Sequence, residues 1–246
     1  MDLGDPHFWM LAAIVAGAFA IEATTGFGAT ILIVTLGAHL FPLATLLPVV
    51  VPLGLVLSVS IAWRGRASID RALVVRRILP LMGVGLAIGL AIFEQASNDT
   101  LRRAFGWFVV VVAASELARM LRATGAVRPL SAGVTRAALL GAGVIHGLFS
   151  SGGPLLVYAL GRQPIEKGVF RATLAAVFLV LATALTIAYS VQGRVGRDSL
   201  AATGALVPVL LLALAAGEWA HRRIDEAHFR ALVYALLVAA GLSNAV

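Results

Sequence analysis

The sequence predicts an all-α integral membrane protein, built as an inverted repeat of two similar halves. Three observations predict this fold: an apolar composition, a series of apolar stretches about as long as a bilayer is thick, and a pattern that recurs after 124 residues. We expect residues 1–124 to form the first transmembrane repeat and residues 125–246 the second, within one integrated membrane domain. Each half is expected to hold one re-entrant, broken-helix hairpin and three transmembrane helices.

The composition is that of a membrane protein. Of the 246 residues, 60% are hydrophobic and only 13% are charged, and the mean hydropathy is +0.97. In soluble domains about a quarter of all residues are charged. This chain therefore has too little polar surface to cover a water-soluble globule. Its net charge of +7 would suit a nucleic-acid binder, but its hydrophobicity would not. We therefore expect a lipid bilayer and no nucleic acid as its partner.

Cysteine is absent from the sequence. This excludes disulfide frameworks and thiolate metal sites, and no cofactor is expected. The chain starts with the acidic segment MDLGDPH, whereas a cleavable signal peptide needs a basic start. The first apolar stretch is therefore expected to remain in the mature protein.

Six apolar stretches have the length of a membrane crossing, which needs about 20 residues for a hydrocarbon core of about 30 Å. One of them, Ile78–Phe93, is short for a full crossing, so its ends are the least well defined. The six predicted crossings are Pro42–Trp63, Ile78–Phe93, Leu101–Leu121, Gly168–Ser190, Ser199–Ala216 and Ala227–Ala245.

Two further apolar stretches, Phe8–Leu40 and Ala137–Gly161, do not fit single crossings. As one helix, the first would be about 50 Å long, yet it is too short for two crossings. The middle of each is polar and rich in glycine, at Ala23–Thr30 and at Phe149–Pro154. We predict two short half-helices joined by a tip, since non-helical backbone at this depth needs protein or water around it. The alternative is one kinked helix with a long solvent end.

The cations are unevenly distributed if each hairpin enters and leaves on one side. One face carries 15 Lys and Arg residues and the other 4. By the positive-inside rule the richer face is cytoplasmic, which predicts a multi-pass protein of the cytoplasmic (inner) membrane with both termini outside. A single crossing at Phe8–Leu40 would move only the N-terminus. The cations of the poorer face are Arg102, Arg103, Arg194 and Arg197.

The internal repeat appears when the chain is shifted by 124 residues. Each half then holds three crossings, an odd number, so the second half is inverted. Inverted repeats with broken helices are typical of secondary transporters that work by alternating access, with a site at the midplane between the repeats; a channel or a scaffold remains an alternative. The matched residues are Gly17, Ala18, Ile21, Gly28, Leu32, Leu36 and Gly37 with Gly141, Ala142, Ile145, Gly152, Leu156, Leu160 and Gly161.

Residues 26–34 (GFGATILIV) and 147–157 (GLFSSGGPLLV) resemble the glycine-rich turns of the TauE/SafE family, the sulfite-exporter-like membrane transporters. Ala44-Thr45 and Ala172-Thr173 are similar to its later motif of a small residue and Thr. The family has a denser run of glycines in both hairpins than GFGAT and SSGGP. The resemblance implies export of small sulfur-containing anions: sulfite, thiosulfate or organosulfonates such as sulfoacetate.

The tips have the chemistry of an anion site. A half-helix that starts after a tip points free N–H groups and its positive end at the tip, and such ends bind anions. The glycines allow close approach of a ligand, and the hydroxyls can donate hydrogen bonds; close helix packing is the alternative role of the small residues. The candidate substrate-binding residues are Thr24, Thr25, Gly26, Gly28, Thr45, Ser150, Ser151, Gly152, Gly153 and Thr173.

Three ionisable residues could serve coupling or substrate contact. Glu22 and His146 precede the two tips and are paired by the 124-residue shift; ionisable groups at such depth indicate function by default. His146 could couple transport to protons, and Glu22 could be its partner or a proton carrier. A hydrogen-bonded pair that only braces the hairpins is the alternative. Arg171 begins a crossing, where snorkelling to the surface competes with substrate contact.

A membrane-embedded enzyme is the main rival to a transporter of small anions. The sequence contains no HExxH, GxSxG or P-loop motif, and no clustered metal ligands. His146 and Ser150 are four residues apart and could suggest a base and a nucleophile, with Glu22 as the acid. We expect no enzymatic activity. The oligomeric state is left open.

Overall fold

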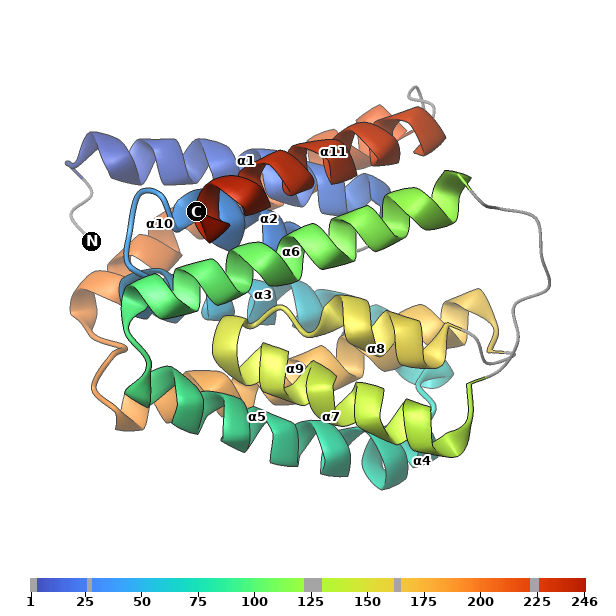
Figure 1. The fold of residues 1–246 in the computed structure, drawn as a ribbon. Helices are drawn as coiled ribbons and strands as arrows, with labels where there is room; N and C mark the ends of the chain where they lie inside the picture. The colour runs from blue at the N-terminus through green and yellow to red at the C-terminus, as the bar shows by residue number, and fades with distance from the viewer. Residues whose placement is uncertain (1–3, 26–27, 122–129, 162–164, 222–225) are drawn as a thin grey trace. The chain divides into compact units, whose positions relative to one another are not determined.

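The computed structural model describes residues 4–25, 28–121, 130–161, 165–221 and 226–246. Every regular element in these ranges is helical (Figure 1). The helices are α1 (Pro6–Thr25), α2 (Ala29–Gly37), α3 (Leu43–Arg64), the 3₁₀ turn η1 (Arg66–Ser68), α4 (Arg71–Leu73), the π turn η2 (Val74–Ile78), α5 (Leu79–Gln95), α6 (Asn98–Leu121), α7 (Ala132–Phe149), α8 (Gly153–Leu160), α9 (Lys167–Val191), α10 (Arg197–His221) and α11 (Glu226–Ala245).

The chain is a multi-pass membrane protein. Within the described ranges, five helical runs are long and apolar enough to cross a membrane: Leu43–Arg64, Arg71–Gln95, Ala132–Phe149, Gly168–Val191 and Arg197–Gly217. The predicted crossings Leu101–Leu121 and Ala227–Ala245 are not among these runs, whereas Ala132–Phe149, from the second predicted hairpin, is. The predicted crossing Ile78–Phe93 is part of a longer run, Arg71–Gln95, in which α4, the π turn and α5 follow one another without a break. The predicted crossing began after Arg76 and Arg77, but both side chains are exposed and lie within the helical run near its start. Arginine stems can lie along apolar surface while their heads reach water.

Both predicted hairpins are interrupted helices. α1 and α2 are separated at residues 26–28, and α7 and α8 at residues 150–152. The prediction of two short arms was wrong for the first arm of each hairpin, because α1 has 20 residues and α7 has 18. The second arms have nine and eight residues, or about 12–14 Å at 1.5 Å per residue. α7 starts five residues before the predicted stretch because Ser131 caps it, accepting a hydrogen bond from the amide of Val134.

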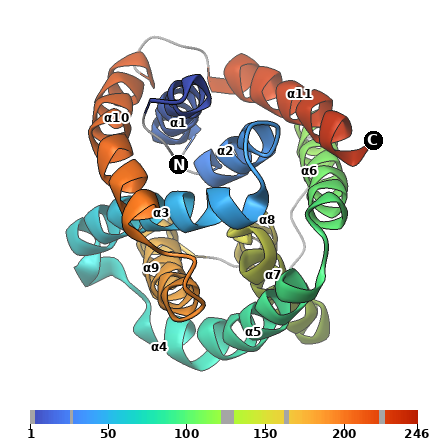
Figure 2. The same ribbon diagram turned by 90° about the vertical axis from the view of Figure 1, so that its left-hand side faces the viewer.

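The helices divide into two compact units. Unit 1 comprises Met1–Val50, Ala96–Gly125 and Arg194–Val246, and unit 2 comprises Val51–Gln95 and Ala126–Gly193. In unit 1, α1 packs against α10 and α6 against α11; in unit 2, α5 packs against α7 (Figure 2). Each unit therefore combines one interrupted hairpin with helices from both halves of the sequence.

Glycines allow α5 and α7 to approach closely. Gly85 and Gly89 on α5 face Gly143 and Gly147 on α7. A Cβ atom at any of the four positions would lie 2.2–2.3 Å from a backbone carbonyl oxygen of the other helix. Small residues spaced four apart are the usual basis of tight helix pairs in membranes. This pairing fixes α7, the helix that carries His146.

A buried polar contact joins α2 to α11 within unit 1. The side-chain amide of Asn244 donates a hydrogen bond of 2.7 Å from Nδ2 to the backbone carbonyl oxygen of Thr35, and both residues are fully buried. The Thr35 hydroxyl in turn donates to the carbonyl oxygen of Ile31. Polar groups in an apolar environment are stable only with such partners, so this contact holds the short arm of the first hairpin in place.

Candidate functional site

The second hairpin reverses direction through Ser150 and Ser151. Ser150 has the left-handed conformation, with φ 53° and ψ 23°, and its amide donates to the carbonyl oxygen of His146 at 2.8 Å. Ser151 is buried, and its hydroxyl donates to the carbonyl oxygen of Phe149 at 2.9 Å. The Ser151 hydroxyl proton therefore stabilises the turn itself.

The two glycines that follow differ in their surroundings. A Cβ atom on Gly152 would lie 2.2 Å from the carbonyl oxygen of Ala142 and 2.9 Å from the Cβ of His146. Gly152 is thus required by close packing of α8 on α7. A Cβ atom on Gly153 would meet only the Cζ of Phe178, at 3.5 Å, an ordinary contact. Of the two roles considered for these glycines, packing applies to Gly152, and Gly153 has room beside it.

His146 lies in the wall of this tip. It is 3% exposed, and its ring stacks on Phe178 of α9 with centroids 5.8 Å apart and an angle of 23°. Neither ring nitrogen has a hydrogen-bond partner among the described residues. A neutral imidazole has one donor and one acceptor, and leaving a buried polar group unpaired costs about 1–3 kcal/mol. The ring nitrogens are thus buried polar groups that no described residue satisfies.

The N-terminus of α8 lies next to His146. Its N-cap, Gly152, supplies no side-chain acceptor, and no described residue accepts a hydrogen bond from the amide of Gly153. The amide of Leu156 bonds to the carbonyl oxygen of Gly152 at 3.1 Å, so the helix is regular from this point. Pro154, in the first turn, has no N–H to satisfy. A helix end of this kind favours anions.

The first hairpin is arranged differently at the matched positions. Glu22 accepts a hydrogen bond of 2.8 Å at its Oε2 from the amide of Ala29, the first residue of α2. Gly28 has φ 110°, a conformation that L-residues rarely adopt, although no atom lies within 4 Å of a Cβ placed there. Glycine is thus required here by backbone conformation. Thr24 and Thr25 end α1, and Gly26 lies outside the described residues.

The remaining predicted site residues have other surroundings. The buried Thr173 hydroxyl accepts a hydrogen bond of 3.1 Å from the amide of Asp70. Thr45 is exposed in the first turn of α3, and Arg171 is exposed near the start of α9. Phe178, which contacts the tip, lies about two helical turns after Arg171. Exposure of Arg171 agrees with the snorkelling alternative.

Phe178 was not identified from the sequence, because an aromatic residue in an apolar helix carries no distinctive signal. Asn244 could have been identified, since it is a polar residue within an apolar stretch. Among the residues that the structure describes, no three His, Cys, Asp or Glu side chains gather as metal ligands would.

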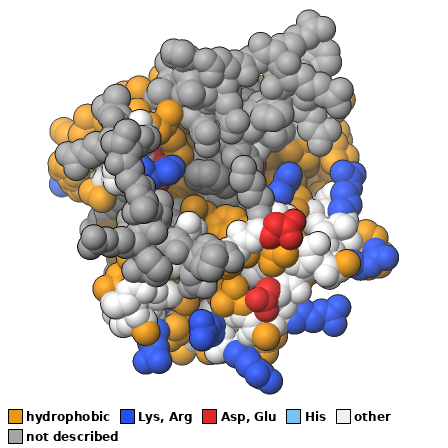
Figure 3. All heavy atoms as spheres, turned by 90° about the vertical axis from the view of Figure 1, so that its right-hand side faces the viewer, with side chains coloured by type: hydrophobic (Ala, Val, Ile, Leu, Met, Phe, Trp, Pro, Cys, Tyr) orange, Lys and Arg blue, Asp and Glu red, His pale blue; other side chains and the backbone are white. Residues whose placement is uncertain are grey.

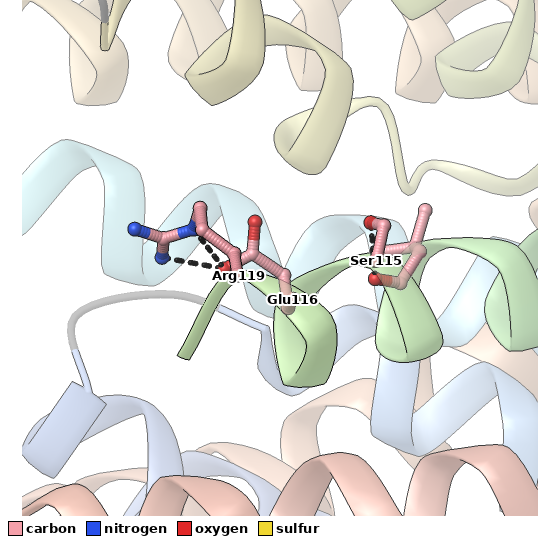
Figure 4. Close-up of polar contacts among 4 residues, drawn as sticks. Ser115, Glu116 and Arg119 are labelled. Atoms are coloured by element: carbon pink, nitrogen blue, oxygen red, sulfur yellow. Dashed lines mark hydrogen bonds and ion pairs between the residues drawn. The ribbon is translucent and has the colours of Figure 1, made fainter. Parts of the chain in front are cut away.

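A charged pair near the end of α6 is satisfied within its own helix. Arg119 donates to Glu116 Oε2 from Nη2 at 2.6 Å and from Nε at 3.0 Å (Figure 4). Neighbouring Ser115 donates to the carbonyl oxygen of Val112 at 2.7 Å. The Arg119 side chain is 70% exposed, and such ion pairs contribute about 0–1 kcal/mol. Both charges are paired locally, so the pair needs no substrate to neutralise it.

Helices long enough to span a bilayer, together with two interrupted hairpins, define a multi-pass membrane protein with the discontinuous helices common in transporters. Residues 9–244 match the family described as sulfite exporter TauE/SafE, and the chain belongs to this family of membrane transporters. It is 25% identical over 248 residues to a protein of Cupriavidus necator described as a probable sulfite/organosulfonate exporter TauE. The alignment covers 97% of this chain and 93% of that protein. No solved structure matches the chain.

Proposed function

We propose that this protein is a secondary transporter that moves small anions across the cytoplasmic membrane by alternating access, in the direction of export. The proposed substrates are sulfur oxyanions or organosulfonates, such as sulfite, thiosulfate or sulfoacetate. Membership of the TauE/SafE family supports this function, as does the description of the Cupriavidus necator relative. Anion transport is favoured over enzymatic catalysis because the tip offers hydrogen-bond donors but no evident nucleophile with a paired base.

The proposed architecture is an inverted repeat of residues 1–124 and 125–246, with both termini outside. The pairing of helices supports the repeat. α1 of the first half packs on α10 of the second, and α7 of the second half packs on α5 of the first. Shifting by 124 residues relates α1 to α7 and relates much of α5 to α10. The backbone bond from Leu32 to Gly28 also has its counterpart from Leu156 to Gly152.

We assign the substrate oxyanion to the tip of the second hairpin. The observation that carries this assignment is His146, a buried imidazole whose ring nitrogens have no partner among the described residues, next to the N-terminus of α8. An oxyanion there would accept hydrogen bonds from the ring and from the amide of Gly153. Backbone N–H groups and a helix dipole bind an anion without a buried cation. His146 is also our candidate for coupling to protons, since an imidazole can bind and release a proton.

At the first hairpin, we propose that Glu22 takes the place that the substrate takes at the second. A carboxyl oxygen and a sulfonate oxygen are both hydrogen-bond acceptors, and Glu22 already accepts from the amide of Ala29. Glu22 and Ala29 are the counterparts of His146 and Gly153 under the 124-residue shift. The first tip is then closed by the protein's own side chain.

Transport is tested with purified protein in liposomes loaded with labelled sulfite, thiosulfate or sulfoacetate. We expect saturable exchange of at least one of these anions, accelerated by unlabelled anion on the opposite side. Flux that ignores both counter-substrate and proton gradients would indicate a channel. No flux of any of the three anions would contradict the proposed substrate class.

A further inference from the structure

A surface pocket in unit 2 is lined by residues that the proposed anion site does not include. It has a volume of about 410 Å³. It lies where α4 and the π turn begin the membrane-length run Arg71–Gln95. Figure 3 shows a face of the molecule on which Lys and Arg side chains gather with acidic side chains among them. The pocket is lined by Asp70, Ala72, Leu73, Arg76, Arg77 and Ile165.

The pocket must lie at a membrane surface. α3 and Arg71–Gln95 are both long and apolar enough to cross a bilayer, so residues 65–70, which join them, lie where the chain leaves the bilayer. Trp63, at the end of α3, is 69% exposed, and the guanidinium of Arg66 lies 5.0 Å from its ring centroid. Exposed Trp residues beside arginines are typical of the interface between lipid and water. The pocket is therefore at the level of the lipid headgroups.

The pocket is held in shape by contacts with α9. The amide of Asp70 donates to the Thr173 hydroxyl at 3.1 Å, and Gly65 packs so closely that a Cβ atom there would lie 2.9 Å from the Cβ of Ala172. Asp70 also caps α4, because its Oδ1 accepts a hydrogen bond from the amide of Leu73 at 2.9 Å. The small-residue-and-Thr motif of α9 thus fixes the wall of this pocket.

The charged groups of the pocket have both signs. Arg76 and Arg77 are consecutive residues of the π turn, and π turns often occur at functional sites. Both side chains are exposed and line the pocket. Arginine binds phosphate oxygens through paired N–H groups. Asp70 Oδ1 is occupied by helix capping, which leaves its second carboxylate oxygen for a donor of the ligand.

We propose that this pocket binds the headgroup of an ethanolamine phospholipid, with the phosphodiester at Arg76 and Arg77 and the ammonium at Asp70. Both charges of that headgroup then have a partner of opposite sign. A headgroup with a negative charge alone would face Asp70 without compensation, and a choline headgroup has no N–H to donate to it. Apolar Leu73 and Ile165 line the same pocket, and Val75 on the π turn is exposed nearby in the sequence. The start of an acyl chain therefore has apolar neighbours.

The test is native mass spectrometry of the purified full chain, mixed with ethanolamine, glycerol and choline phospholipids that share the same acyl chains. The ethanolamine lipid should be retained in preference to the other two by about tenfold, as expected for one charge-assisted hydrogen bond. Arg76→Gln with Arg77→Gln should abolish retention. Asp70→Asn keeps the helix cap, since Asn caps as well as Asp, and should remove only the preference over the other headgroups.

Arg64→Gln with Arg136→Gln is the matched control, because it removes two exposed arginines of unit 2 outside the pocket. It should leave the preference unchanged. Equal retention of the three lipids, stronger retention of the glycerol lipid, or an equal loss in the control would overturn the proposal. Displacement of the lipid by equimolar glycerophosphoethanolamine would also overturn it, because the site would then bind a soluble phosphate ester. The measurement records lipid retention only, so its outcome is separate from that of the transport assay.

Discussion

The two hairpins share a backbone pattern but differ in how their polar groups are satisfied. In the first, Glu22 accepts a hydrogen bond from Ala29 at the start of the short arm. In the second, His146 takes the position of Glu22, and neither its ring nitrogens nor the amide of Gly153 has a partner among the described residues. One tip is completed by its own side chain, and the other has polar groups without a partner among the described residues.

The glycines of the two tips differ in the same way. Gly28 is required for its positive φ, with open space around it, whereas Gly152 has an ordinary φ and is required by packing against α7. Matched glycines in a repeat therefore need not have the same role. Each tip must therefore be tested with its own substitutions.

The largest expected effect follows from replacing His146. His146→Phe keeps an aromatic ring against Phe178 but removes both ring nitrogens, so anion affinity should fall by about tenfold to a hundredfold. His146→Asn, which keeps a donor, should retain more of the affinity. Isothermal titration with sulfoacetate or sulfite in detergent measures both. Wild-type affinity in His146→Phe would exclude this ring from the site.

Gly152→Ala should destabilise the second hairpin. Its methyl group would meet the Ala142 carbonyl oxygen at 2.2 Å, and overpacking of this kind costs about 1–3 kcal/mol. Gly153→Ala is the matched control, since its methyl group makes only an ordinary contact with Phe178. Thermal unfolding in detergent should separate the two variants. Equal melting temperatures would show that α8 does not pack on α7 as described.

Gly28→Ala should destabilise the first hairpin through its backbone conformation. A positive φ costs an L-residue about 1–2 kcal/mol. Gly17→Ala, in α1 of the same unit and with no atom within 4 Å of the added methyl group, should be neutral or stabilising. Chemical unfolding monitored by circular dichroism compares them. A neutral Gly28→Ala would mean that the left-handed conformation is not required.

Glu22→Ala should have the smallest effect. It removes the acceptor for the amide of Ala29 and should cost about 1 kcal/mol, as for other helix caps. Glu22→Gln, which keeps an oxygen acceptor, should be nearly neutral. In both variants the affinity for sulfoacetate should stay within about twofold of the wild-type value. A twofold change is well below the change in affinity expected when one hydrogen bond to the ligand is lost. A loss of affinity as large as that of His146→Phe would show that the first hairpin also contacts the substrate.

Much of the fold was predictable because the bilayer limits helix lengths. Apolar stretches that fit neither one crossing nor two marked the two interrupted helical segments, and the Gly, Ser and Thr clusters located their breaks. The lengths of the first arms could not be predicted, because a capping serine at residue 131 extends α7 beyond its apolar stretch. The run Arg71–Gln95 was underestimated because charged residues end an apolar stretch without ending a helix.

The candidate site was predictable only in part. His146 was identified because an ionisable residue deep in an apolar stretch is unusual. Its stacking on Phe178 depends on tertiary structure, as does the hydrogen bond between Thr173 and Asp70, which are 103 residues apart. Thr173 was assigned to the substrate from its motif, but its buried hydroxyl holds the loop before α4.

Binding of an anion beside His146 can be observed by titrating ¹⁵N-histidine-labelled protein with sulfoacetate and following the ring nitrogens by NMR. We expect one histidine to shift saturably, and the shifting signal to disappear in His146→Asn. Saturable binding that leaves the His146 ring nitrogens unchanged would contradict the assignment of the site.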